Sequence, residues 1–400
     1  MRKSLSCLLL AALLLSFHVA RAVGAETASE PLPKAAAPLL EGVPVEASCG
    51  ALMLLELDSG QSIFEMNADT PRSVASVTKL MTILLTLEAL DSGRVRPEET
   101  VTVSQAAAGM GGSQILLDVG ERQSVSTLLK TMIVGSANDS AVALAEALFG
   151  GEAACVDAMN RRASELGMTS THYENCTGLP AEGQRTTARD IAALSRQVFA
   201  HPRYFEYSGI WMEDIDHGDG RLTQMVNTNK LIRLYDGCDG GKTGSTKEAG
   251  YCISATALRG DMRLIAIVLG AASGRERFAI VQRMFDYGFA NYRRYPVARR
   301  GARVCGELPV DGGDRPGVSL LLDGSLTLLL PKGGEQDIRL MPDLPERVAA
   351  PVEAGQTVGS VAVNVEGRTV ARIPIVAAES VPAVGISSFL ERMWKHWRMC

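Results

Sequence analysis

Three short polar segments in a fixed order constrain this chain more than any other feature of its sequence. They are Ser76-Val77-Thr78-Lys79, Ser136-Ala137-Asn138 and Lys242-Thr243-Gly244, whose first members are separated by about 60 and about 106 residues. Any one of them is common by chance. Each also lies where its chemistry would need it: at the start of an apolar helix, between two helices, and just before a β-type strand. Together the segments predict one site assembled from distant parts of the chain.

Ser76 and Lys79 carry the chemistry of the first segment. They stand three residues apart at the start of a helix predicted over residues 79–90, which places both side chains on one face. A serine hydroxyl needs a neighbouring base to attack at neutral pH, and a lysine acts as one only when burial or a nearby cation lowers its pKa. The apolar residues after Lys79 would supply the burial, and Lys242 the cation. A helix-capping serine beside a surface lysine is the alternative, and the apolar run argues against it.

Ser136 and Asn138 lie between two helices, predicted over residues 126–134 and 141–149. A hydroxyl and an amide in this place can relay a proton to a leaving group and hold a substrate amide. The alternative is a helix N-cap cluster, because serine, asparagine and Asp139 all cap helices well.

Lys242 and Thr243 suit a substrate carboxylate at the edge of a cleft, and Gly244 would let a substrate backbone approach. The next amide, that of Ser245, could pair with the amide of Ser76 as an oxyanion hole. A turn before a strand is the alternative for a triplet that stands alone.

The region around these segments mixes helices with antiparallel strands. The pattern predicts a hairpin of residues 51–55 with 62–64, a second antiparallel pair of 251–258 with 263–269, and a helix over 279–289. Residues 231–241, rich in glycine and aspartate, are predicted as a loop that leads to the third segment. An α+β domain over residues 46–292 is therefore expected.

Helical periodicity ends beyond about residue 292. Two hairpins are predicted there, 318–322 with 326–330 and 358–365 with 370–376, around Asp323-Gly324 and Glu366-Gly367. Because 400 residues exceed one compact core, we expect residues 293–378 to form a second, small all-β domain.

The two ends of the chain have the character of targeting segments. Residues 1–25 combine a basic start, an apolar stretch and a small-residue cleavage site, as in an export signal, and residues 26–45 are a flexible leader. Residues 379–400 contain an amphipathic helix with two tryptophans and mostly basic polar residues, typical of a segment in a membrane interface. An uncleaved N-terminal anchor and a C-terminal helix docked on the protein's own core are the alternatives.

Composition excludes several classes of function. The net charge is −5 and no basic stripe with interleaved aromatics is present, so a nucleic-acid partner is not expected. The eight cysteines, seven without the signal, have no zinc-like or scaffold-like spacing, and pairing is left open. No metal or other cofactor is expected, since the five histidines lack HExxH spacing. Asp214, Asp216, His217 and Asp219 form a cluster that we interpret as an acidic surface loop.

The chain resembles the low-molecular-mass penicillin-binding proteins that are serine D-alanyl-D-alanine carboxypeptidases. The resemblance extends from about Ala47 to the C-terminus. Beside the three segments, which as a set are typical of penicillin-binding proteins and β-lactamases, it rests on Gly112-Ser113, Asn175-Cys176-Thr177-Gly178-Leu179-Pro180, Thr187-Ala188-Arg189-Asp190, Asn227-Thr228-Asn229, Ala249-Gly250-Tyr251-Cys252, Arg277-Phe278 and Tyr287-Gly288-Phe289.

The resemblance implies a fold and an activity. The fold would be a penicillin-binding, β-lactamase-like domain with helices around an antiparallel sheet, then the small all-β domain and the C-terminal amphipathic helix. The enzyme would remove the terminal D-alanine from peptidoglycan stem peptides on the outer face of the cytoplasmic membrane. Penicillins and other β-lactams would acylate the same serine.

The resemblance also assigns roles to single residues. Ser76 would be acylated, Lys79 would be its base, and Ser136 with Asn138 would handle the leaving group and the acyl chain. Lys242 and Thr243 would bind the terminal carboxylate.

Around these residues, Gly244 and Ser245 would complete the substrate-binding strand. Arg277 is a second candidate partner for the carboxylate, with Arg275 close enough in sequence to compete for that role.

Two departures from the family pattern and three competing functions bear on this interpretation. Many relatives have proline where this chain has Cys176, and some have a bulkier residue at Ser245. A class A β-lactamase would need a Glu-x-x-Leu-Asn segment, but Glu174 is followed by Asn175-Cys176-Thr177. A D,D-endopeptidase that cuts cross-links and a non-catalytic β-lactam or wall sensor remain alternatives; the intact serine, lysine and asparagine argue against the sensor.

Overall fold

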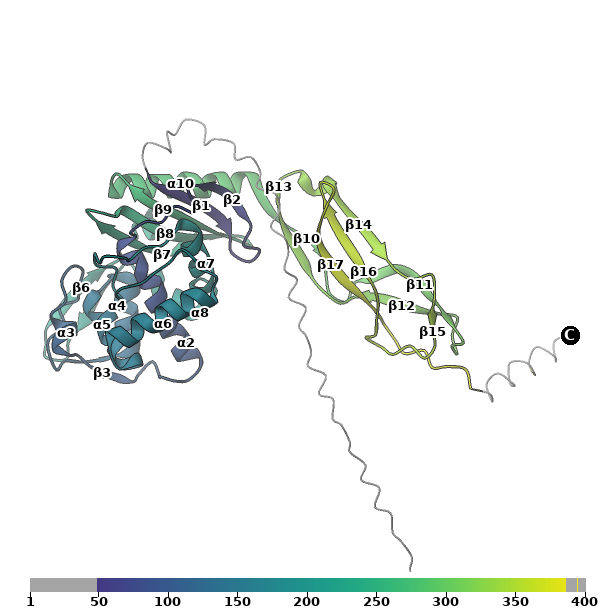
Figure 1. The fold of residues 1–400 in the computed structure, drawn as a ribbon, viewed down its shortest axis with the longest axis horizontal. Coiled ribbons are helices and arrows are strands. Elements are labelled where there is room, and N and C mark those ends of the chain that lie inside the picture. Colours follow the sequence, from purple (N-terminus) through teal and green to yellow (C-terminus); the bar gives the residue numbers. More distant parts are fainter. Residues whose placement is uncertain (1–48, 386–393, 395–400) are drawn as a thin grey trace, which may run out of the picture.

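The computed structural model describes residues 49–385 and Trp394. In Figure 1 the described chain has two parts: a larger part in which helices surround a sheet, and an elongated part made of strands. Strand β10 (Tyr292–Ala298) follows directly on helix α10 (Gly274–Asn291) and leads from the first part into the second.

A five-stranded antiparallel sheet is the frame of the larger part. Its order is β2-β1-β9-β8-β7, so that β7, which carries the third polar segment, lies at one edge. The strands are β1 (Ala51–Glu56), β2 (Ser62–Met66), β7 (Cys238–Thr246), β8 (Gly250–Arg259) and β9 (Met262–Ala271). The two strand pairs predicted from the sequence, β1 with β2 and β8 with β9, are both present.

The sheet separates two hydrophobic cores because successive side chains of a strand point to opposite faces. On one face, Met53 and Ile267 pack with the group of helices, and on the other, Leu54 and Val268 pack with α10. The predicted strands were apolar without alternation, which is the pattern of strands that are buried on both faces.

Helix α2 (Lys79–Asp91) is the centre of the helical group. It is buried at eleven positions, including Lys79, so the apolar run predicted a central helix correctly. Around it lie α4 (Val125–Val134), α5 (Asn138–Phe149), α6 (Glu152–Glu165) and α7 (Ala188–Val198). The shorter elements of this part are η1 (Ala75–Thr78), β3 (Thr100–Thr102), α3 (Gln105–Ala108), β4 (Arg122–Ser124), α8 (Pro202–Ser208), β5 (Met212–Asp216), β6 (Leu222–Val226) and α9 (Leu231–Leu234).

Two short segments differ from the sequence prediction. The loop predicted over residues 231–241 contains helix α9 and the first residues of β7, which the hydrogen bonds of the sheet extend backward to Cys238. Asn138 begins helix α5 and does not lie before it.

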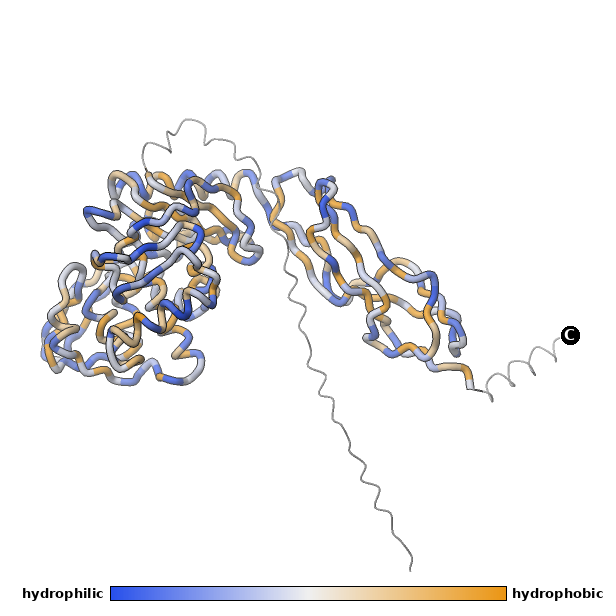
Figure 2. The backbone as a smooth tube through the Cα atoms, viewed as in Figure 1, coloured by the Kyte–Doolittle hydropathy of each residue, from blue (hydrophilic) through white to orange (hydrophobic). Residues whose placement is uncertain are grey.

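The elongated part is built almost entirely from strands, along which apolar and polar segments alternate (Figure 2). A six-stranded sheet has the order β14-β16-β17-β12-β11-β15, and β10 pairs with β13 in a separate ribbon. The elements are β11 (Arg303–Asp311), β12 (Gly317–Leu322), β13 (Leu326–Pro331), η2 (Gly334–Asp337), β14 (Ile338–Asp343), β15 (Val348–Ala349), β16 (Thr357–Val365) and β17 (Arg368–Ala377).

Of the two hairpins predicted in this part, one is present and the prediction of the other is wrong. β16 and β17 do form a hairpin, in which Glu366 and Gly367 both have the positive φ of a tight primed turn. β12 and β13 are strands at the predicted residues, but β12 pairs with β11 and β17, whereas β13 pairs with β10. The Asp323 amide still donates to the Pro374 carbonyl of β17 at 2.8 Å, and after this turn β13 pairs in the other sheet, so the chain changes sheets here.

Of the predicted C-terminal segment, residues 379–385 are described: they are not helical and lie against the β part, where Val381 is buried and bridges to Val352 and Ala383 bridges to Gly313. The rest of that segment, apart from the exposed Trp394, and the predicted N-terminal segments lie outside the described residues. Within residues 49–385, no helix combines the length and the apolar character needed to cross a membrane. Among the described cysteines none forms a disulfide; five are buried and Cys305 is exposed.

Candidate active site

Ser76 lies on a tight turn at the entrance to the central helix. It is the second residue of the 3₁₀ helix η1, which continues into α2 at Lys79. Residues three apart eclipse each other in a 3₁₀ helix, so Lys79 comes directly behind Ser76. The Lys79 Nζ donates to the Ser76 Oγ at 2.9 Å. This is the nucleophile–base distance that serine activation requires.

Lys79 is wholly buried, and its pKa is lowered to about 7. Burial is the main cause, because an ammonium loses its hydration inside the protein; charges on Cys176 and Asp139 act in the opposite direction. The apolar residues after Lys79 therefore do supply the dry surroundings expected from the sequence. A pKa near neutrality allows the amine to take a proton at physiological pH.

The segment Asn175–Leu179 forms the other half of the Lys79 pocket. The Thr177 carbonyl accepts from the Lys79 Nζ at 2.7 Å. The Asn175 Oδ1 accepts from the Gly178 amide at 2.7 Å, and its Nδ2 donates to the Leu179 carbonyl at 3.0 Å, which folds the segment. Sequence reasoning noted these residues only as part of a resemblance and missed their contact with the base, which involves a main-chain carbonyl.

The structure explains two residues of this segment, Gly178 and Cys176. Gly178 has φ +82° and lies against η1, the turn that carries Ser76 and is called the nucleophile turn below. A Cβ on Gly178 would lie 2.0 Å from the Ala75 carbonyl oxygen. The Cys176 amide donates to the Glu152 carboxylate at 3.1 Å, and its Sγ lies 3.2 Å from the same oxygen. A proline at this position could not donate that hydrogen bond.

Ser136 and Lys242 form a second hydroxyl–lysine pair. Ser136 is buried in the turn between α4 and α5 with φ +63°, and its Oγ accepts from the Lys242 Nζ at 2.7 Å. Lys242 is also wholly buried and donates to the Thr243 carbonyl at 3.0 Å. Burial, followed by the positive charges of Lys79 and Arg277, lowers the pKa of Lys242 well below its ordinary value.

Asn138 faces the segment that precedes α4. Its amide donates to the Ser113 carbonyl at 2.7 Å and its Nδ2 to the Gly111 carbonyl at 2.6 Å, while its buried Oδ1 has no partner among the described residues. The neighbouring Asp139 accepts from the amides of Ile115 and Leu117, both through Oδ2. The N-cap cluster considered as an alternative is therefore not formed by these two side chains: the N-cap of α5 is Ala137, and both side chains hold residues 111–117.

Gly244 brings strand β7 against the nucleophile turn. A Cβ on Gly244 would lie 2.5 Å from the Val74 carbonyl oxygen and 2.8 Å from the Ser76 nitrogen. From the sequence, this glycine was predicted to allow the approach of a substrate backbone. The structure shows that it also allows β7 to contact the nucleophile turn. Ser245, the next residue, is exposed.

Arg277, and not Arg275, reaches the edge strand. Its Nη1 donates to the carbonyls of Gly244 and Cys252, both at 3.1 Å, and its Nε is buried without a partner among the described residues. Burial lowers the pKa of its guanidinium. Arg275 is exposed on the first turn of α10.

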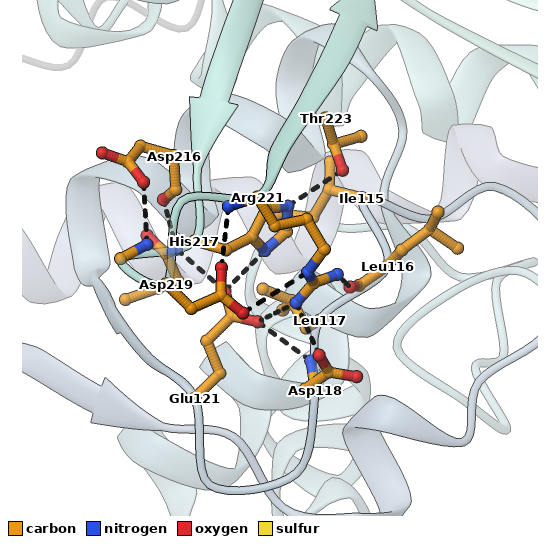
Figure 3. A network of polar contacts seen from close by, with 12 residues as sticks. Ile115, Leu116, Leu117, Asp118, Glu121, Asp216, His217, Asp219, Arg221 and Thr223 are labelled. Atoms are coloured by element: carbon orange, nitrogen blue, oxygen red, sulfur yellow. Dashed lines mark hydrogen bonds and ion pairs between the residues drawn. The ribbon is translucent and has the colours of Figure 1, made fainter.

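The acidic cluster noted in the sequence is part of a network on the β5–β6 hairpin (Figure 3). Asp214, Asp216 and Asp219 are exposed as expected, but the His217 side chain is buried, with Nδ1 2.8 Å from Glu121 and Nε2 2.9 Å from Thr223. No group of metal-ligating side chains occurs within residues 49–385.

Arg221 links the hairpin to the wall of the site. Its Nη1 donates to the Leu116 carbonyl and its Nη2 to Asp118 and Glu121 (Figure 3). Asp139, which follows the second polar segment, accepts from the amides on both sides of Leu116. The loop around Leu116 is therefore held both by Arg221 of the hairpin and by Asp139.

The fold therefore brings all nine predicted site residues to one edge of the sheet, through η1, the α4–α5 turn, β7 and α10. A hydroxyl with a buried amine behind it, a second such pair and a cationic strand define a serine acyl-transfer enzyme.

Comparison with known proteins gives the family. The D-alanyl-D-alanine carboxypeptidase family model matches residues 36–273, and the C-terminal domain of penicillin-binding protein 5 matches residues 292–383. D-alanyl-D-alanine carboxypeptidase DacF of Bacillus subtilis is 35% identical over 86% of this chain and 89% of that protein.

Solved structures agree with this assignment. Penicillin-binding protein 5 of Haemophilus influenzae has a TM-score of 0.73 at 27% identity, covering 84% of this chain and 98% of that one. Penicillin-binding protein D2 of Listeria monocytogenes in its ampicillin-bound form has a TM-score of 0.54 at 32% identity, covering 60% and 97%.

The chain belongs to the D-alanyl-D-alanine carboxypeptidase family. It is a serine-type D-alanyl-D-alanine carboxypeptidase, a hydrolase of peptidoglycan stem peptides that acts outside the cytoplasm. The fold class expected from the sequence is confirmed, apart from the C-terminal helix.

Proposed function

We propose that Ser76 is the residue that is acylated and that Lys79 is its base. The observation that carries this proposal is the 2.9 Å contact between the Lys79 Nζ and the Ser76 Oγ, with the amine wholly buried. Lys79 takes the hydroxyl proton as the Oγ attacks the carbonyl carbon of the penultimate D-alanine. The amides of Ser76 and Ser245 stabilise the oxyanion that forms.

The second pair of side chains serves the leaving group. When the C–N bond breaks, the proton held by Lys79 passes to the leaving nitrogen, with the Ser136 Oγ as relay, and D-alanine departs. Lys79, again neutral, then activates the water that hydrolyses the acyl ester and returns the proton to the Ser76 Oγ. The contact of Ser136 with Lys242 supports the relay because it fixes the hydroxyl.

The substrate carboxylate binds at Lys242 and Thr243, where two buried cations, Lys242 and Arg277, supply positive charge. Asn138 holds the acyl chain, and its unpartnered Oδ1 is available to a substrate amide N–H. Gly244 positions the strand, and Arg277 fastens it through the Gly244 carbonyl.

We also propose how the enzyme reaches its substrate. Residues 1–25 direct export, residues 26–45 are a leader before the catalytic domain of residues 46–292, and residues 293–378 form the β domain. Residues 379–400 bind the outer surface of the cytoplasmic membrane. β-Lactams bind at Ser76, which the ampicillin-bound relative supports.

The test is release of D-alanine from diacyl-L-Lys-D-Ala-D-Ala, with and without penicillin preincubation. We expect release that penicillin abolishes. Covalent labelling of Ser76 by penicillin without release of D-alanine would contradict the carboxypeptidase assignment and favour an endopeptidase or a sensor.

A further inference from the structure

A cavity of about 530 Å³ lies beside the proposed catalytic groups, at the end of the central sheet. Ser245, Tyr251 and Ala271 line it, and they are neighbours across three strands: Ser245 pairs with Tyr251 and Tyr251 with Ala271. Neither Ser76 nor Lys79 lines the cavity. Through Ser245 it adjoins the proposed oxyanion hole, so it is a candidate for a part of the substrate away from the scissile bond.

The charged residues of the cavity are not neutralised by the protein. Arg72, Lys247 and Glu248 line it, and none of them forms an ion pair with another described residue. The Arg72 Nε is buried without a hydrogen-bond partner among the described residues. Two cations and one carboxylate therefore line one space, and the Nε–H of the Arg72 guanidinium has no acceptor among the described residues.

The placement of Arg72 depends on two glycines. A Cβ on Gly50 would lie 2.2 Å from the guanidinium carbon, and one on Gly270 would lie 3.4 Å from Nη1. The guanidinium thus rests against bare backbone at the ends of β1 and β9. The Arg72 amide and carbonyl are fixed by Thr186, which holds this residue three positions before the nucleophile turn.

The direction of the bound peptide connects this cavity to the stem. With the terminal carboxylate at Lys242 and Thr243 and the scissile carbonyl at Ser245, the peptide runs antiparallel to β7, which has a free edge in the sheet. Each residue advances about 3.4 Å along a strand. The residue before the two D-alanines then lies level with Thr246 and Lys247, at the cavity.

We propose that this cavity is the subsite for the third residue of the stem peptide and that it selects a side chain ending in both a carboxylate and an ammonium group, a diamino dicarboxylic acid. Arg72 and Lys247 bind the carboxylate, Glu248 binds the ammonium, and Tyr251 covers the aliphatic part. A lysine side chain would bring an ammonium group alone. The inference rests on the proposed function of the neighbouring Ser76 site.

The test compares three Nα-acyl-X-D-Ala-D-Ala peptides whose side-chain amine is left free, in which X is meso-diaminopimelate, the same residue with its distal carboxyl amidated, or L-lysine. Wild-type kcat/KM should be about tenfold or more higher for the free carboxylate, because a charge-assisted hydrogen bond contributes about that factor. Arg72→Gln and Lys247→Gln should each reduce this preference to about threefold or less, and leave the lysine peptide unchanged.

The controls distinguish failure of the subsite proposal from failure of the proposed function. Lys247 is an exposed turn residue, so Lys247→Gln tests the charge even if Arg72→Gln unfolds the protein. An unchanged rate of penicillin acylation shows that the variants keep the Ser76 site. Equal kcat/KM for the free and amidated peptides would overturn the subsite alone, whereas no release from any peptide would overturn the proposed function.

Discussion

At the scale of single residues, the proposed mechanism depends on the burial of two lysines. Both Lys79 and Lys242 are wholly buried, and each has a serine hydroxyl within 2.9 Å. Burial lowers both pKa values, and the charge of Lys79 lowers that of Lys242 further. A pKa near 7 allows Lys79 to act as a base in a place where an ordinary lysine would remain charged.

The rate of acylation should rise with pH through about 7. Lys79 is active when neutral, and its pKa is lowered from 10.5 to about 7, so the active fraction grows about tenfold per pH unit below that value and then levels. The measurement is the second-order rate constant for penicillin acylation between pH 5 and 9. A rate that is independent of pH below 7 would contradict Lys79 as the base.

Gly244→Ala should impair acylation by tenfold or more. The added Cβ would lie 2.5 Å from the Val74 carbonyl, so β7 or the nucleophile turn must shift, and small displacements at a reacting centre are costly. The matched control is Gly209→Ala, where φ is −80° and nothing lies within 4 Å of the new Cβ. Equal acylation rates for both variants would show that the close approach is not required.

Sequence reasoning identified the proposed catalytic residues but not the groups that hold them in place. Ser76, Ser136 and Lys242 were identified by type and spacing. The Thr177 carbonyl was missed because a main-chain acceptor has no signature of its own. Arg277 could be separated from Arg275 only by the orientation of α10, which follows from packing against the sheet.

At the scale of elements, the β5–β6 hairpin holds the loop that forms one wall of the site (Figure 3). Glu121 joins His217 and Arg221 to this loop, and its side chain is 5% exposed. Burial acts to raise the pKa of Glu121, but hydrogen bonds from the Asp118 amide, Gln123 and His217 outweigh it, so that the pKa is lowered. The network is therefore stable as long as Glu121 is ionised.

His217→Phe should lower the free energy of unfolding by about 1–3 kcal/mol, since it removes the hydrogen bonds that the buried His217 ring makes with Glu121 and Thr223. Urea unfolding measures the effect. Asp214→Asn, an exposed change on the same hairpin, is the control and should stay within about 0.5 kcal/mol of the wild type. If both variants match the wild type, the network does not stabilise the fold.

The positions of helices and strands were predicted better than the pairing between strands. Apolar runs predicted α2, β8 and β9 because burial alone decides these elements. The pairing of β12 with β13 was wrong because Asp323-Gly324 forms a turn in which the chain changes sheets, and a turn sequence does not specify which strand lies opposite.

At the scale of the whole molecule, a single arginine spans the two parts. Arg294, on β10, pairs with Asp58 at 2.6 Å and donates to the Asp261 carbonyl at 2.7 Å. Leu329 of β13 belongs to the same hydrophobic core as α10. The β part is thus joined to the catalytic part at the end opposite to its own C-terminal end (Figure 1).

Removal of residues 386–400 should release the exported protein from membranes and leave its penicillin acylation rate unchanged. The reason is that the proposed interfacial helix follows the last strand in the sequence and includes none of the proposed site residues. Sedimentation with vesicles that contain anionic lipid measures the effect. Sedimentation of the truncated protein with vesicles to the same extent as the full chain would show that another segment binds the membrane.

The assignment of Ser76 as the nucleophile can be tested by identifying the residue that penicillin acylates. Mass spectrometry of the penicillin-treated protein should show one adduct, on the peptide that contains Ser76, and Ser76→Ala should show none while it unfolds at the wild-type urea concentration. An adduct on another residue, or an undiminished adduct in folded Ser76→Ala, would contradict the assignment of Ser76 as the nucleophile.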